Sequence, residues 1–356
     1  MAKRSASIGS ADSDCVEGFD HPRETFALLG QDAALDNVAR AIRSGRPPGA
    51  WLISGPPGIG KATLAYRIAR YLLAYGATDA GPADLSVPED HPAARQIAAQ
   101  AHPGLLVLRR AVNPRTGRLM TVLSVDEIRR LADFFGMTSG AGGWRVAIVD
   151  SADDMNDNAA NALLKMLEEP PADALLLLLS HAPGRLLPTI RSRCRRLDLR
   201  PLDDATLERA LARYLPEAGA AERAALTRLA DGSIGAALTL ASGDGAALAE
   251  EADRLIDQAR APDILALLAL GEKLSRLRDG LDLFGGFLAA ALARRIRVRA
   301  HQGGPGLDRW MLDRWMQAQA RIEQQFARAS GLNLEPRQTV LTAARDLAGV
   351  ARMGPL

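Results

Sequence analysis

Several features that are common in other classes of protein are missing from this sequence. Cysteine occurs only at Cys15 and Cys194 in 356 residues, which is typical of a reducing compartment and too few for a four-cysteine zinc site. No apolar run approaches the roughly 18 residues of a membrane-spanning helix, and no apolar leader segment follows the first residues. We therefore expect a cytoplasmic protein without a membrane partner.

Aromatic side chains and net charge are also low. Phe, Trp and Tyr make up 4% of the residues, in a chain rich in Ala and Leu, which favours helical packing over β-sandwiches. The formal net charge of +2 is too small for a bulk nucleic-acid coat, although local basic faces remain open. The length of 356 residues predicts two or three domains.

What is present begins with a glycine-rich motif between an apolar run and a helical pattern. Gly55, Gly60 and Lys61 have the spacing G-x-x-x-x-G-K of a phosphate-binding P-loop, with Gly58 between them. In such a loop, backbone N–H groups surround the phosphates and the lysine reaches the β- and γ-phosphate oxygens. The motif therefore predicts a site of nucleotide-binding ancestry.

The position after the lysine departs from this motif. P-loop NTPases place Ser or Thr there to hold Mg²⁺, and here it is Ala62. Thr63 comes one residue later and is rotated by about 100° around the helix, so it is a poor replacement. Hydrolysis is not expected, and binding of ATP or ADP is left open.

Alternating apolar runs and helical patterns predict a parallel α/β sheet in the first 200 residues. Beyond residue 200 only helical patterns follow. Residues 311, 315, 318, 322 and 326 form one apolar stripe on a helix. The expected organisation is a flexible tail (1–20), an α/β domain (21–200), a small helical unit (201–245) and a helical C-terminal domain (246–356).

An acidic residue ends the third expected strand. Asp150 stands where the second acid of a P-loop ATPase holds Mg²⁺, although a turn or a helix cap would also explain it. Many such hydrolases place a glutamate next to polarise water, but Ser151 is a feeble general base. Asp153 and Asp154 are expected to point elsewhere once the strand turns.

A run of arginines surrounds Cys194. Arg191, Arg193, Arg195 and Arg196 fit a solvated basic face. The alternative is that Arg193 is an arginine finger that enters a neighbour's nucleotide site, which contributes about 10³–10⁵ in rate. Cys194 is expected to be a small buried residue and not a nucleophile.

The helical C-terminal region carries two further candidates. Trp310 and Trp315 are expected to be core or subunit-contact residues and not base-stacking platforms. The arginines 294, 295, 297 and 299 are expected to form a solvated helix end, with a nucleic-acid or partner surface as the alternative.

The order of the motifs resembles that of bacterial DNA polymerase III clamp loader subunits. The block Asn161–Pro171 followed by Ser192–Cys194 is the most specific part. The other matching segments are Gly30-Gln31, Gly55–Lys61, Ser124–Arg129 and Val146–Asp150. The resemblance covers residues 25–245 by motif and the rest by architecture. It implies an AAA+ P-loop domain, a helical lid at 201–245 and a collar at 246–356 that joins a five-subunit ring.

Two types of subunit within this family were weighed. The motor type (gamma/tau) hydrolyses ATP, and the delta prime type is a non-hydrolysing stator. Ala62, Ser151 and Gly235 all depart from the motor pattern, the last at the position of a second-sensor arginine, whereas Arg193 is kept. The departures point to the delta prime type, in which Arg193 would act in trans. Ser180 matches the polar first-sensor position.

The resemblance also implies partners. Motor subunits and the delta subunit would complete the ring, and the complex would bind the sliding clamp and primed DNA. Many relatives carry a four-cysteine zinc module after the P-loop helix, but residues 76–102 contain no cysteine, so no zinc is expected. The rival hypotheses are an active AAA+ ATPase, with Thr63 or water completing the Mg²⁺ shell and Asp153 positioning water, and more remotely a standalone DNA-binding protein.

Overall fold

The computed structural model describes most of the chain. The described residues are 16, 18–78, 80–111, 120, 122–136, 143–277, 279–302, 309–332, 334–354 and 356. Most of the expected tail, 1–20, lies outside them. The chain divides into two units, Met1–Thr239 and Leu240–Leu356. Residues 201–239, which we expected in a lid domain of their own, belong to the first unit, and the finer domain boundaries stay a prediction.

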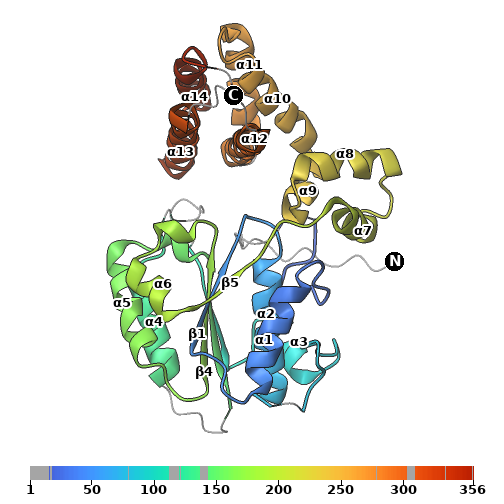
Figure 1. Cartoon of the computed structure of the whole chain (residues 1–356), viewed down its shortest axis with the longest axis vertical. Helices are drawn as coiled ribbons and strands as arrows, with labels where there is room; N and C mark the ends of the chain where they lie inside the picture. Colours follow the sequence, from blue (N-terminus) through green and yellow to red (C-terminus); the bar gives the residue numbers. More distant parts are fainter. Residues whose placement is uncertain are drawn as a thin grey trace. The chain divides into compact units, whose positions relative to one another are not determined.

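Five parallel strands form the sheet of the first unit, in the order β2-β3-β4-β1-β5 (Figure 1). The strands are β1 (Ala50–Ser54), β2 (Leu105–Leu108), β3 (Arg145–Val149), β4 (Ala174–Ser180) and β5 (Arg195–Asp198). The predicted parallel α/β sheet is confirmed. Because all strands run the same way, their carboxyl ends lie at one edge of the sheet and their amino ends at the other.

The sheet is buried on both faces. Side chains alternate between the faces of a strand, so Leu177 and Leu179 of β4 enter one core while Leu176 and Leu178 enter a second. Every residue of β4 is buried. This explains why the sequence of β4 is a continuous apolar run without alternation.

Helices cover the two faces (Figure 1). One face carries α1 (Asp32–Arg43), α2 (Lys61–Tyr75) and α3 (Pro92–Ala98), and the other carries α4 (Val125–Gly136), α5 (Asp157–Glu168) and α6 (Pro188–Arg193). Short 3₁₀ turns, η1 (Ala152–Asp154) and η2 (Pro183–Arg185), follow β3 and β4. We did not anticipate α3, which is short and weakly periodic. Its start is marked by Pro92 at the first turn and by His91, whose Nδ1 accepts a hydrogen bond from Ala93 N at 3.2 Å.

Three helices follow β5, namely α7 (Asp204–Tyr214), α8 (Ala220–Ala230) and α9 (Ile234–Ala241). Asp203 caps α7 by accepting a hydrogen bond from Thr206 N at 2.8 Å. Asp231 ends α8 in the left-handed conformation, with φ of 50°, and the chain turns directly into α9. These helices lie within residues 201–245, where the sequence predicted a small helical unit, and the separate lid domain stays a prediction.

The second unit is helical throughout its described residues. It contains α10 (Gly245–Asp257), α11 (Ile264–Arg276), α12 (Gly280–Gln302), α13 (Arg309–Leu332) and α14 (Pro336–Ala351). The stripe predicted on α13 is confirmed, since Trp315, Ala318, Ile322 and Phe326 are buried in the core of this unit. Trp310 is half exposed, and Arg314 stacks over its ring at 5.2 Å.

The arginines of α12 are not all at a solvated helix end. Arg294 and Arg295 both pair with Asp253 of α10 at 2.9 Å, and Arg295 also pairs with Asp257 at 2.5 Å. Two of the four residues in the predicted basic cluster therefore connect helices within the unit.

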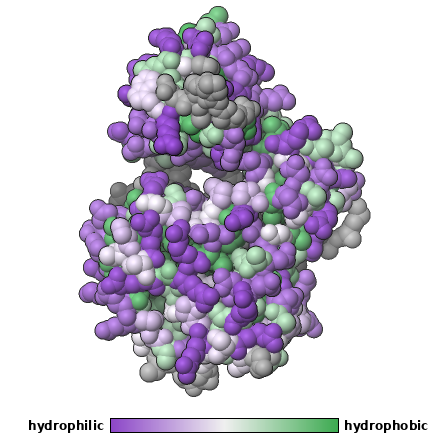
Figure 2. All heavy atoms as spheres, viewed as in Figure 1, coloured by the Kyte–Doolittle hydropathy of each residue, from purple (hydrophilic) through white to green (hydrophobic). Residues whose placement is uncertain are grey.

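The visible surface is mostly hydrophilic, as expected when most apolar residues are buried. Figure 2 shows hydrophilic side chains over most of the visible face, with hydrophobic ones scattered between them. No helix within the described ranges combines the length and apolar character needed to span a membrane.

Replacement of Leu177 tests the buried sheet. Leu177 is 0% exposed at the centre of β4, so Leu177→Ala should lower the free energy of unfolding by about 2–5 kcal/mol through lost contacts and a cavity. Leu265→Ala, on a side chain that is 78% exposed, is the matched control and should change it by less than about 0.5 kcal/mol. Urea unfolding followed by circular dichroism measures both, and equal effects would contradict the assignment of Leu177 to the core.

Candidate functional site

The predicted nucleotide-site residues meet at the carboxyl edge of the sheet. The P-loop connects β1 to α2, and Gly55 N donates a hydrogen bond to Ser180 O at 3.2 Å at the end of β4. Asp150 follows β3 and is buried, with 8% of its surface exposed. The structure therefore brings the P-loop, Asp150 and Ser180 together, as the sequence predicted.

Gln31 connects the P-loop to the segment after β5 through two hydrogen bonds. Gln31 is buried, and its Nε2 donates hydrogen bonds to Ile59 O at 3.2 Å and to Arg200 O at 2.8 Å. Ile59 is itself only 1% exposed. Gln31 was part of the sequence resemblance, but its role in joining the P-loop to the segment after β5 could not be read from the sequence.

Lys61 bonds to its own loop. Its Nζ donates hydrogen bonds to Gly55 O at 2.8 Å and to Pro56 O at 2.6 Å. An ammonium has three donors, so two of them are used by the loop's carbonyl groups. The residue is buried, with 4% of its surface exposed.

Burial changes the acidity of Lys61. Removal from water lowers the pKa of this amine to about 8, and the nearby carboxylates of Asp150 and Asp153 oppose the shift only in part. The P-loop lysine thus lies close to both acids, one of which we did not expect there.

Asp153 is a correction to the sequence analysis. We expected it to point away from the site, but η1 turns it back toward the end of β4. Its carboxylate accepts hydrogen bonds from Ser180 Oγ at 2.7 Å, Ser151 Oγ at 2.9 Å and His181 N at 2.5 Å. The chain reverses within three residues of β3, and this tight turn had no clear signal in the sequence.

These contacts limit what Asp153 can do chemically. A carboxylate has about four acceptor positions, and Ala182 N supplies a further contact at 3.4 Å. Asp153 is therefore committed to holding the ends of β3 and β4 together. It is poorly placed to polarise a water molecule, which was the role that the rival ATPase hypothesis required of it.

The start of α9 contacts the P-loop directly. Ser233 Oγ donates a hydrogen bond to Pro57 O at 2.9 Å, and Gly235 N donates one to Gly58 O at 2.9 Å. Ser233 also caps α9, because its Oγ accepts from Ala236 N at 3.1 Å. The sequence showed the Gly-Ser punctuation here but not what it contacts.

Both positions of this contact require glycine. Gly58 has φ of 73°, and a Cβ there would lie 2.4 Å from Ser233 Oγ and 3.0 Å from Gly235 Cα. A Cβ on Gly235 would lie 2.8 Å from Gly58 Cα. The second-sensor arginine of motor subunits would therefore meet the backbone of the loop.

The site does not fit a Mg²⁺-bound nucleotide. Ala62 has no oxygen for the metal, Ser151 replaces the catalytic acid, and the backbone of the lid lies on Gly58. Thr63 is half-buried one residue further along α2. Within the described residues, no group of three or more His, Cys, Asp or Glu side chains is arranged to hold a metal ion.

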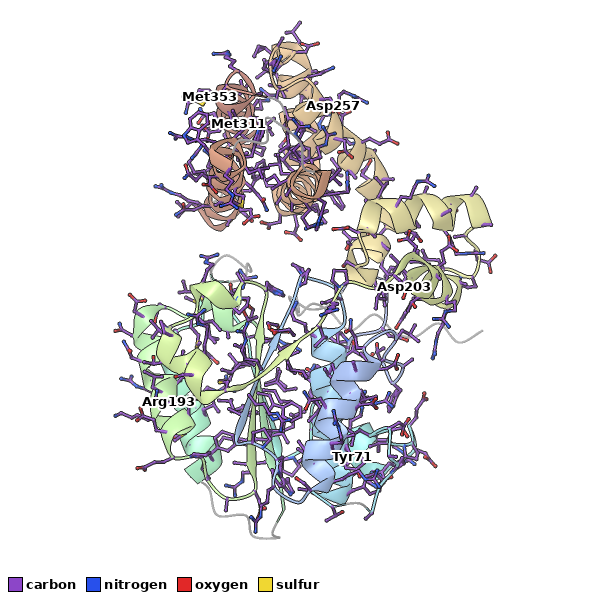
Figure 3. The ribbon with its side chains drawn as sticks, viewed as in Figure 1. Tyr71, Arg193, Asp203, Asp257, Met311 and Met353 are labelled. Atoms are coloured by element: carbon purple, nitrogen blue, oxygen red, sulfur yellow. The ribbon has the colours of Figure 1, made fainter. Side chains whose placement is uncertain are left out.

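Arg193 lies at the opposite edge of the sheet. It ends α6 two residues before β5, and Arg195 pairs in register with Trp51 near the start of β1. In Figure 3, Arg193 and Tyr71 lie on opposite faces of the sheet, the latter on the α2 side. The structure does not bring Arg193 to the chain's own P-loop.

The guanidinium of Arg193 is exposed and paired. Its Nη2 lies 2.8 Å from Glu168 Oε1, and its Nη1 donates to Thr189 O at 3.3 Å. Cys194, the next residue, is buried, and burial raises the pKa of its thiol to about 12. The expectation that Cys194 is structural and not a nucleophile is confirmed.

Comparison with known proteins finds relatives of the first half of the chain. The profile of the family described as "DNA polymerase III, delta subunit" matches residues 30–203. Over 187 residues the chain is 42% identical to the DNA polymerase III subunit delta' of Pseudomonas aeruginosa, and over 216 residues it is 35% identical to that of Escherichia coli. Over about half of its length, the chain is therefore similar to delta prime subunits of DNA polymerase III.

The similarity is confined to part of each chain. The two delta prime matches cover 52% and 59% of this chain, and 53% and 59% of the relatives' own length. The chain is also 32% identical over 232 residues to the DNA polymerase III subunit tau of Salmonella typhimurium, covering 62% of this chain and 34% of that protein. The parallel α/β sheet and the helical region that follows it are as the motifs predicted.

The pH dependence of stability tests the burial of Lys61. Its pKa of about 8 in the folded chain lies below the roughly 10.4 of an unfolded lysine, so the unfolded state binds more protons between these values. Stability should therefore rise with pH in this window. Relative to Lys61→Met, the wild type should gain roughly 2–3 kcal/mol between pH 7 and pH 10.

Urea unfolding at the two pH values measures this gain. Comparison with the variant removes the contribution of other groups that titrate in the same range. A constant difference between wild type and variant would show that Lys61 is solvated and charged throughout.

Proposed function

We propose that this chain is a delta prime type stator subunit of the replicative DNA polymerase III clamp loader. It would help to load the sliding clamp onto primed DNA without hydrolysing ATP, and Arg193 would act on ATP bound to a neighbouring motor subunit. The similarity to delta prime subunits of DNA polymerase III supports the role in a clamp loader. The rest of the proposal is supported by the positions of the P-loop, at the carboxyl edge of the sheet, and of Arg193, at the amino edge.

The observation that carries the proposal is the contact of Gly235 with Gly58. In a P-loop ATPase the nucleotide lies on the loop, and in a motor subunit the second-sensor arginine of the lid reaches it. Here the N–H of Gly235 donates a hydrogen bond to Gly58 O at 2.9 Å, and neither residue has room for a side chain. The lid is thus attached to the core by the protein's own backbone, and no nucleotide is needed for it.

The polar groups around the loop agree with this proposal. Lys61 donates to two carbonyl groups of its own loop, and Asp153 is saturated with donors. Ala62 and Ser151 lack the groups that bind Mg²⁺ and polarise water. A site with this arrangement has a structural role.

The position of Arg193 suggests where it acts. A parallel strand advances about 3.3 Å per residue, and Arg193 lies at the amino edge while the P-loop lies at the carboxyl edge. An exposed arginine at this edge can serve only a site on another subunit. We infer that the partners are motor subunits of the gamma/tau type and the delta subunit in a five-subunit cytoplasmic ring.

Replacement of Arg193 tests the proposed function. In a complex in which only the motor subunit next to this chain has an intact P-loop, Arg193→Ala should lower the ATP turnover by about 10³-fold or more. The physical reason is the loss of the positive charge that neutralises the γ-phosphate in the transition state. Steady-state hydrolysis with clamp and primed DNA present measures the effect.

Two variants control this experiment. Arg196→Ala removes the same charge from the same basic run, where Arg196 pairs with Asp198 at 3.6 Å, and should leave turnover unchanged. Lys61→Ala should also leave it unchanged, since the chain's own P-loop takes no part in hydrolysis. Loss of turnover with Lys61→Ala but not with Arg193→Ala would show that the chain is a motor subunit.

A further inference from the structure

The ion pair of Arg193 joins the ends of two neighbouring helices. Glu168 is the last residue of α5, and Arg193 is the last residue of α6. Nη2 of the arginine lies 2.8 Å from Glu168 Oε1, with the side chains 37% and 50% exposed. Thr189 O accepts a hydrogen bond from Nη1 at 3.3 Å. Two separate groups of the chain therefore direct the guanidinium.

The backbone beneath each partner is fixed by the core. Ile190 and Cys194, on either side of Arg193, are 0% and 8% exposed. Leu167, next to Glu168, is buried, and a Cβ built on Gly49 at the start of β1 would lie 2.8 Å from the ring of Pro170. Buried neighbours therefore hold the backbone on which the two exposed side chains of the pair stand.

Helix electrostatics disfavour the acid at this position. The carboxyl end of a helix carries partial negative charge, so acidic residues there are destabilising. Nevertheless α5 ends with Glu168 and is followed by Glu169. A departure from a local rule of this kind is expected where a residue has a functional role. The positive charge of Arg193 is the compensation that the structure provides for Glu168.

We propose that Glu168 is a positioning residue for Arg193. Its carboxylate holds the guanidinium in the orientation from which it reaches the nucleotide of the adjacent subunit. The inference rests on the proposed function, since it assumes that Arg193 acts in trans. A long, exposed arginine samples many rotamers, and the pair with Glu168 restricts them before the subunits meet.

The pairing leaves donors for the neighbour's phosphate. A guanidinium has five N–H groups, and the hydrogen bond to Thr189 O uses one of them, on Nη1, while Nη2 forms the ion pair with Glu168. The remaining N–H groups include donors that can bond phosphate oxygens while both contacts stay in place. Glu168 can therefore stay bound when Arg193 engages its target.

The test is the ATP turnover of the same complex, with only the motor subunit next to this chain intact. Glu168→Ala should lower kcat by about two- to fivefold, the range expected for an exposed ion pair, and leave KM for ATP unchanged. Glu168→Gln should give an intermediate kcat, because its amide oxygen carries only a partial negative charge and attracts the guanidinium less than the carboxylate does.

Glu169→Ala is the matched control. It removes the same charge one residue later, and between these two described residues, Glu169 and Arg193, there is no ion pair. This variant should turn over ATP like the wild type. Combining Glu168→Ala with Arg193→Ala should lower kcat no further than Arg193→Ala alone, because a positioning residue acts only through the group that it positions.

The outcomes separate the inference from the proposed function. If Arg193→Ala lowers kcat but Glu168→Ala leaves it unchanged or raises it, the inference is wrong and the proposed function stands. An additional loss in the double variant would also overturn the inference, since Glu168 would then act by another route. If Arg193→Ala has no effect, the proposed function fails and the inference fails with it. Size-exclusion chromatography of each complex shows that assembly is intact.

Discussion

The parallel direction of the five strands is the constraint on which the rest of the structure depends. It gathers the P-loop, Asp150 and Ser180 at the carboxyl edge, and it places Arg193 and Glu168 at the amino edge. The two sets of groups therefore lie apart within one chain. This separation is the reason for the proposal that Arg193 acts on a second subunit.

At the carboxyl edge, the properties that allow a loop to bind phosphate also allow it to contact another segment of backbone. A glycine without Cβ leaves its N–H and C=O accessible, and either a phosphate or another segment of chain can use them. Here Gly58 is contacted by Gly235, and the loop's lysine bonds to Gly55 O and Pro56 O. The P-loop motif is present in the sequence, but its contacts connect the α/β core to the start of α9.

Much of the fold could be predicted because its elements have strong periodicity. The parallel α/β sheet in the first 200 residues and the stripe of α13 were predicted correctly, since their apolar patterns are long and regular. The short α3 was missed for the opposite reason. Asp153 was predicted to point away, because a turn of three residues decides its direction and leaves no periodic signal.

The sequence by itself determined the parallel α/β sheet, the P-loop motif that contains Lys61 and the arginine run that contains Arg193. These follow from local spacing, which each segment carries wherever it folds. Only the tertiary structure decided that Gly235 lies on Gly58 and that Glu168 pairs with Arg193. Such contacts join segments that are far apart in the chain, or that end different helices. They depend on packing distances of a few ångströms, which no local pattern of residues encodes.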